Sequence, residues 1–189
     1  MRLCTPFGRQ SGPRGKRDAA GVSRLEMLIA VIGIALLILL TLDRLLPLRG
    51  QAEAASVMNA EGAMRSALGI ETAARVLRVG FKALPELAGS NPMDLLAERP
   101  ANDQGARPAV DAHELAPGAW AFDAGRGVLV YRVRFAQYFT GPLTDPARAE
   151  WRIDVLYAGD PGQPENIRGV QLTQLAAGRW AVDQQEPRK

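Results

Sequence analysis

The sequence GVSRLE at residues 21–26, followed by the apolar run MLIAVIGIALLILLTL at residues 27–42, decides how this chain is organised. A helix that crosses a bilayer core needs about 20 apolar residues, with a range of about 17–25. The run reaches that length when its apolar neighbours are counted, which are Val22, Leu25, Leu45, Leu46 and Leu48. We therefore predict a membrane-spanning helix with one carboxylate, Glu26, near its start.

The residues before this run account for the basic character of the chain, whose pI is about 9.4. Residues 1–21 hold five arginines and lysines against Asp18 alone, so the remaining chain has 18 basic and 19 acidic residues. The charge of the body therefore does not favour binding to nucleic acid. Cations beside an apolar run stay in the cytoplasm, so we expect a disordered cytoplasmic leader and a translocated C-terminal body.

The body has few of the residues from which catalytic or metal sites are built. Cys4 is the only cysteine, so the body has no internal disulfide and must be stabilised by a packed core. His113 is the only histidine, which argues against histidine-based catalysis, and no P-loop, paired-cysteine, HExxH or GxSxG motif occurs. The loop with Asp160, Glu165 and Asn166 has too few oxygen ligands for calcium and is expected to be a surface turn. We expect no enzyme activity, no cofactor and no metal.

Three interpretations of the apolar run remain open at this point. It can be a secretory signal peptide, with Ala52-Glu53-Ala54 as a small-residue cleavage site. It can be a plain signal anchor that is never cleaved. The third interpretation depends on the junction at Gly21.

Residues 21–26, with a basic leader before them and an apolar helix after them, resemble the N-terminal signature of type IV pilins and type II secretion pseudopilins. In that family the prepilin peptidase cuts after the glycine and methylates the new first residue. The resemblance implies a cut between Gly21 and Val22, which makes Glu26 the fifth mature residue and the assembly carboxylate. Val22 departs from the usual phenylalanine and Arg24 is less common at its position, but the glycine and the glutamate are in place.

The resemblance implies a structural role as a minor pilin or pseudopilin subunit, with no cofactor. The chain would be a single-pass inner-membrane protein with a periplasmic C-terminal domain, and would then enter a type IV pilus or a type II secretion pseudopilus. The implied partners are the prepilin peptidase, the inner membrane and other subunits through the N-terminal helix, and no nucleic acid. The alternative is a membrane-anchored periplasmic binding or scaffold domain that does not polymerise.

A physical argument links the two residues of the signature. An ionised carboxylate within a membrane is costly unless it is paired. Cleavage after Gly21 creates an amine on Val22, and the Glu26 of one chain can meet that amine on a neighbour, which would set register. The alternative is that Glu26 is a helix-start carboxylate favoured by the helix dipole and has no partner.

We divide the chain into a cleaved leader (1–21), a hydrophobic transmembrane and assembly helix (22–49), an amphipathic helix continuation with a loop (50–118), and a sheet region (119–189). Pro47 predicts a kink or local melting near residues 44–50, or else a helix end at Leu46. The apolar stripe of the second helical part is Val57, Ala60, Met64, Ala67, Ile70, Ala74 and Leu77.

After residue 118 the hydrophobic period changes to two, which predicts strands at 119–123, 128–135, 151–157, 170–175 and 178–182. In the second strand Leu129, Tyr131, Val133 and Phe135 form the predicted buried face. Trp120, Trp151 and Trp180 lie in strands and are expected to pack in the core. The predicted fold class is α+β, with a long N-terminal helix packed on a small antiparallel meander, as in pilins.

Overall fold

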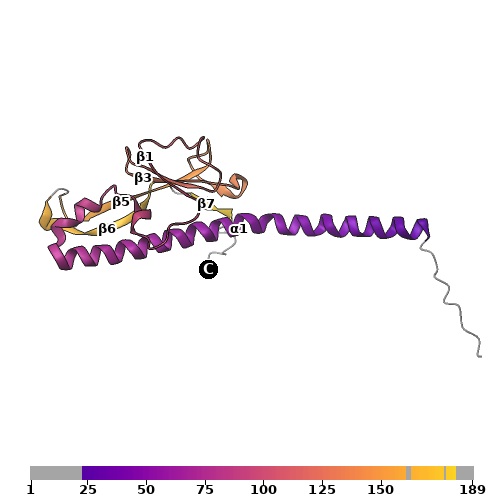
Figure 1. The fold of residues 1–189 in the computed structure, drawn as a ribbon, viewed down its shortest axis with the longest axis horizontal. Helices are drawn as coiled ribbons and strands as arrows, with labels where there is room; N and C mark the ends of the chain where they lie inside the picture. Colours follow the sequence, from indigo (N-terminus) through magenta and orange to yellow (C-terminus); the bar gives the residue numbers. More distant parts are fainter. Residues whose placement is uncertain (1–22, 161–162, 177, 182–189) are drawn as a thin grey trace, which may run out of the picture. The chain divides into compact units, whose positions relative to one another are not determined.

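The computed structural model describes residues 23–160, 163–176 and 178–181, with the backbone alone for residues 43, 44, 46, 47 and 164. The chain divides between Leu42 and Asp43 into two units. One helix, α1 (Arg24–Val79), contributes to both units, and all the other helices and strands belong to the second, which we call the body (Figure 1). The structure is thus α+β, as the sequence predicts.

Helix α1 does not end or melt at Pro47, because residues 44–50 are all α-helical. Both the predicted local melting and the alternative helix end at Leu46 are therefore wrong. A proline inside a helix removes one backbone hydrogen bond and costs about 3 kcal/mol. Here the helix continues for more than seven turns on the C-terminal side of Pro47, and its packing in the body can offset a local cost of this size. The helix ends before Gly80, because the φ of Gly80 is 93° and an α-helix requires a negative φ.

The prediction of which α1 residues form the apolar stripe is correct for the first part of the stripe and wrong for its last part. Val57 and Met64 are buried and belong to the core, but Ile70 is 73% exposed and Leu77 is 87% exposed. A helix turns by 100° per residue, so the predicted positions wind around it by about 160° between residues 57 and 77. The core-facing stripe instead runs through Leu68 and the half-buried Val76.

The sheet has five strands in the order β1-β2-β3-β5-β6. Their bounds are β1 (Asp103–Arg107), β2 (Trp120–Asp123), β3 (Val128–Arg132), β5 (Arg148–Tyr157) and β6 (Ile167–Gln174). Strands β2, β3, β5 and β6 are paired antiparallel in chain order, which confirms four strands of the predicted meander. The predicted last strand, at residues 178–182, is wrong as a member of this sheet, because β7 pairs with β4 instead. β1 was not predicted, and it pairs parallel to β2, so the sheet is mostly but not wholly antiparallel.

The remaining elements are short. Two strands, β4 (Phe139–Thr140) and β7 (Arg179–Trp180), form a separate antiparallel pair. The described part of the chain also contains four 3-10 helices: η1 (Phe81–Leu87), η2 (Pro92–Leu95), η3 (Ala136–Tyr138) and η4 (Pro164–Asn166). The Asn91 side chain accepts a hydrogen bond from the Met93 amide at 3.1 Å, so Asn91 is the N-cap of η2.

Both faces of the central strands are buried, where the sequence predicts one. The larger core packs α1 residues such as Met64 against one face, and it contains Trp120, Trp151 and Trp180 as expected. The predicted buried face, which includes Leu129 and Tyr131, leaves Val128 and Val130 on the outer side of the strand, and this prediction is wrong. Both valines are buried in a second cluster with Leu115, Ala119 and Ala121, because the segment that follows β1 covers that face.

Gly50 marks a close approach between α1 and the turn after β3, since a Cβ added there would lie 2.6 Å from the ring of Tyr138. We expect Gly50→Ala to destabilise the body by about 1–3 kcal/mol, because the ring has to move out of a packed position. Gly62 lies on the same helix with nothing within 4 Å of its added Cβ. Gly62→Ala should stabilise by about 0.5–1 kcal/mol through helix propensity alone. Thermal unfolding of the two variants is expected to shift in opposite directions.

Candidate functional site

The predicted site residues divide between the described and undescribed parts of the chain. Gly21 and Val22, the predicted processing junction, lie outside the described residues. Glu26 lies in the first turn of α1 and is exposed. Within the described residues Glu26 makes no ion pair, so a partner for its carboxylate would have to come from elsewhere.

Ser23 immediately precedes α1 and caps its start. Its hydroxyl accepts a hydrogen bond from the Glu26 amide at 3.3 Å, and its carbonyl accepts one from the Met27 amide at 3.0 Å. These are the contacts of an N-cap, and Ser-x-x-Glu is the sequence of a capping box. Ser23 thus caps one of the first amides of the helix, and the Glu26 side chain makes no hydrogen bond or ion pair within the described residues.

The segment that follows is apolar on every side. Residues 24–42 are long and apolar enough to cross a membrane, and none of this segment is buried. Its large side chains are each at least half exposed, among them Leu28, Ile32, Leu36 and Leu39. A helix that is apolar all round requires an apolar environment, which is a membrane or a bundle of other helices.

A buried carboxylate, Glu53, joins α1 to the sheet. Glu53 is only 8% exposed, and its two oxygens accept three hydrogen bonds. The donors are the Tyr131 hydroxyl at 2.8 Å, the Arg134 amide at 2.6 Å and the Phe135 amide at 2.9 Å. Burial, followed by the hydrogen bond to Glu53, raises the pKa of Tyr131 well above its usual value, so Tyr131 is a permanent donor. The arrangement fixes the end of β3 on the helix.

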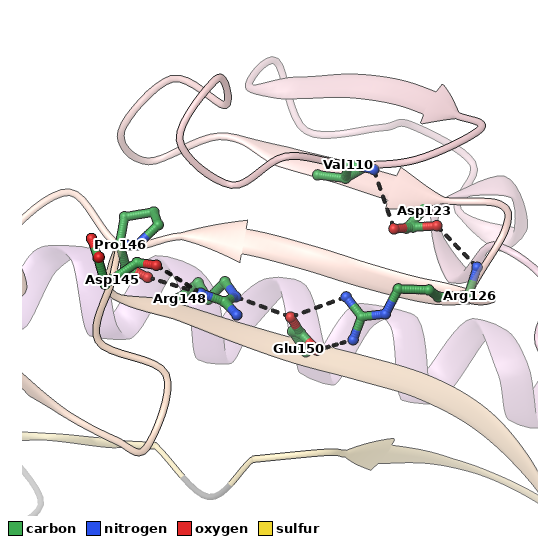
Figure 2. A network of polar contacts seen from close by, with 7 residues as sticks. All are labelled: Val110, Asp123, Arg126, Asp145, Pro146, Arg148 and Glu150. Carbon is green, nitrogen blue, oxygen red and sulfur yellow. Dashed lines mark hydrogen bonds and ion pairs between the residues drawn. The ribbon is translucent and has the colours of Figure 1, made fainter.

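A second buried carboxylate, Glu150, lies between two arginines on the other face of the sheet, as Figure 2 shows. Arg126 and Arg148 contact it at 2.7 Å and 3.1 Å. Burial by itself raises the pKa of Glu150, but the hydrogen bonds from Arg126 and Arg148 outweigh it, and the net pKa is lowered. Nearby, the Asp123 side chain accepts from the Val110 and Arg126 amides, which ties the covering segment to the β2–β3 turn (Figure 2).

The lowered pKa of Glu150 predicts a pH dependence of stability. The folded pKa lies below the unfolded value of 4.5, so the stabilisation is present above pH 4.5 and is lost as the pH falls through the folded pKa. Glu150→Gln is therefore expected to flatten the acid limb of a stability curve measured by thermal unfolding between pH 6 and pH 3. Glu98→Gln, an exposed carboxylate, is the matched control and should leave that limb unchanged.

The other groups considered from the sequence form no site in the described part of the chain. His113 is exposed, with its Nε2 at 3.8 Å from the Asp145 carboxylate. No cluster of metal-binding side chains occurs among the described residues. In the Asp160–Asn166 loop, the Asn166 amide donates to the Asp160 carbonyl at 3.2 Å, which is a turn contact.

Among the residues with a role in the structure that the sequence did not predict are Glu53, Ser23 and Glu150. Glu53 was noted only as part of a possible cleavage sequence. A signal for its burial was present, because the stripe of Val57, Ala60 and Met64 extended back by one turn falls on residue 53.

Comparison of the chain with protein-family models, with curated proteins and with solved structures found no match. Its function is therefore argued from its own residues.

Proposed function

We propose that this protein is a minor pilin or pseudopilin, a structural subunit that is cleaved after Gly21 and assembles through its N-terminal helix. The observation that carries the proposal is the spacing of Gly21 and Glu26 between a basic leader and an exposed apolar helix. The α+β body, in which α1 packs on a small and mostly antiparallel sheet, is compatible with a pilin-like architecture. The machine it would serve is a type IV pilus or a type II secretion system.

The packing of α1 argues against the signal-peptide alternative. Cleavage after Ala54 would remove Glu53, which accepts three hydrogen bonds from the sheet, and the buried Ala54 itself. A protein processed there would leave the Tyr131 hydroxyl and two backbone amides without this acceptor, at a cost of about 1–3 kcal/mol for each buried group. Retention of the whole of α1 is therefore favoured.

The mass of the mature chain tests the proposal directly. Mass spectrometry of the protein from membranes is expected to find Val22 at the N-terminus, with the added mass of one methyl group. A chain that begins at Ala55 would establish the secreted alternative. A chain that keeps its leader would favour the second candidate, a membrane-anchored scaffold that does not polymerise.

A further inference from the structure

A cavity of about 330 Å³ lies in the body where α1 meets the end of β3, and we call it the junction cavity. Two arginines line it, Arg49 from α1 and Arg134 from the residues after β3. The Ser56 hydroxyl and the Asn102 side chain contribute further polar groups. The cavity thus combines two arginines and one carboxylate, Glu53, with neutral hydrogen-bonding groups.

Neither arginine has a carboxylate partner within the part of the chain that the structure describes. Glu53 also lines the cavity, but hydrogen bonds from Tyr131 and from two backbone amides already engage both of its oxygens. The contrast is a second cavity of about 310 Å³, where Arg126 and Arg148 both contact Glu150. The two cavities therefore differ in how their arginines are paired. Among the described residues, the arginines of the second cavity contact a carboxylate, and those of the junction cavity do not.

The chain also holds one of these guanidinium groups in place. Gly118 has a φ of 81°, and a Cβ added to it would lie 2.7 Å from Arg134 Nε. Arg134 Nε donates to the Pro117 carbonyl at 3.3 Å, and the Gly118 carbonyl accepts from Asn102 at 2.6 Å. The missing side chain at Gly118 therefore makes room for the Arg134 guanidinium. A guanidinium held in this way loses less entropy when it binds an anion.

The sequence places Arg49, which lines the cavity, close to the end of the apolar segment. Arg49 follows Leu42, the last residue of the apolar segment, by seven residues. Seven residues span about 10 Å as a helix and at most about 25 Å when extended. The headgroup layer on each side of a bilayer adds roughly 5–7 Å to the apolar core. The Arg49 side chain is therefore near enough in sequence to the apolar segment to contact a phospholipid phosphate.

We propose that the junction cavity binds the phosphate of an anionic phospholipid through Arg49 and Arg134. The inference rests on one part of the proposed function, membrane anchoring by residues 24–42, and is independent of cleavage and assembly. Each basic residue near an anionic membrane surface contributes ~1 kcal/mol, which corresponds to about a fivefold change in affinity. The lipid would fix the height of the body above the membrane.

The test uses the full chain in a nonionic detergent, titrated with short-chain phosphatidylglycerol and, separately, phosphatidylcholine. Native mass spectrometry measures the bound lipid. We expect phosphatidylglycerol to bind more tightly than phosphatidylcholine. Arg49→Gln and Arg134→Gln should each weaken its binding about fivefold, and the double variant about 25-fold. Arg168→Gln is the matched control, because it removes an exposed charge outside the cavity and should leave binding unchanged.

Three results would overturn the inference: equal binding of the two lipids, equal loss in the Arg168→Gln control, or displacement of the lipid by inorganic phosphate at the same concentration. The last would assign the cavity to free phosphate. If Arg134→Gln fails to fold, Arg49→Gln still decides, because Arg49 is exposed on a helix. A chain that is never cleaved at Gly21 but prefers phosphatidylglycerol would contradict only the proposed function. A processed chain without this preference would contradict only the lipid site.

Discussion

Glu53→Ala is expected to destabilise the body by about 3–5 kcal/mol, because it removes the shared acceptor of one buried and two part-buried donors. The Tyr131 hydroxyl and the amides of Arg134 and Phe135 would lose hydrogen bonds of 2.6–2.9 Å. A donor left without an acceptor inside a protein lowers stability by more than its hydrogen bond contributes. Removal of Glu53 should therefore destabilise the body more than removal of a surface carboxylate. A loss of this size should lower the melting temperature by roughly 10–15 °C.

Near-UV circular dichroism of the full chain measures this loss, because Trp120, Trp151 and Trp180 are all buried in the core of the body. Glu61→Ala is the matched control on the same helix. Glu61 pairs at 2.6 Å with Arg65, whose side chain is 57% exposed, so its removal should cost less than about 1 kcal/mol. Similar melting temperatures for the two variants would show that Glu53 does not join helix and sheet.

Glu26→Leu is expected to abolish assembly while the chain still inserts into the membrane. The substitution removes a charge and makes the helix more apolar, so insertion should be unchanged or improved. What is lost is the only carboxylate in the first turn of α1, and with it the proposed partner for the Val22 amine of a neighbouring chain. Filaments recovered by shearing, compared with the membrane fraction of the same cells, measure the two properties separately.

Ser23→Ala separates assembly from helix capping. It removes the hydroxyl that accepts from the Glu26 amide and costs about 0.5–2 kcal/mol at the helix start, but it leaves the carboxylate in place. Glu26→Leu does the reverse, because the capping bond uses the backbone of residue 26. We expect the Ser23→Ala chain to assemble. Equal defects in both variants, or normal assembly of Glu26→Leu, would rule out the assembly role.

The features that the sequence predicted well depend on local patterns. The meander β2-β3-β5-β6 was found from alternation and turn residues, and the helix start from a basic leader beside an apolar run. The strand β1 was missed because Asp103–Arg107 is polar, contains a glycine and lies at a sheet edge. Its partner, β2, is more than ten residues away and parallel, so no short-range signal indicates the pairing.

The candidate sites were harder to predict because they depend on tertiary contacts. A glutamate within an amphipathic helix is normally a surface charge, and only the donors at the end of β3 make Glu53 an interior acceptor. The pairing of Glu150 with Arg126 joins residues 24 positions apart and follows from the β3–β5 pairing. The burial of both faces of β3 was hard to predict for the same reason. The segment that covers its outer face is irregular and has no regular hydrophobic period.

The position of Trp180 has a consequence for biogenesis. Trp180 is buried in the same core as Ala54, and its ring lies 5.1 Å from that of Phe139. The core therefore contains residues from near the first and the last described positions of the body. With the proposed topology, in which the leader stays in the cytoplasm and the body crosses the membrane, this core cannot close until residue 180 has also crossed. Completion of folding would thus be coupled to completion of translocation, and the chain would stay unfolded enough to be threaded until its last turn emerges.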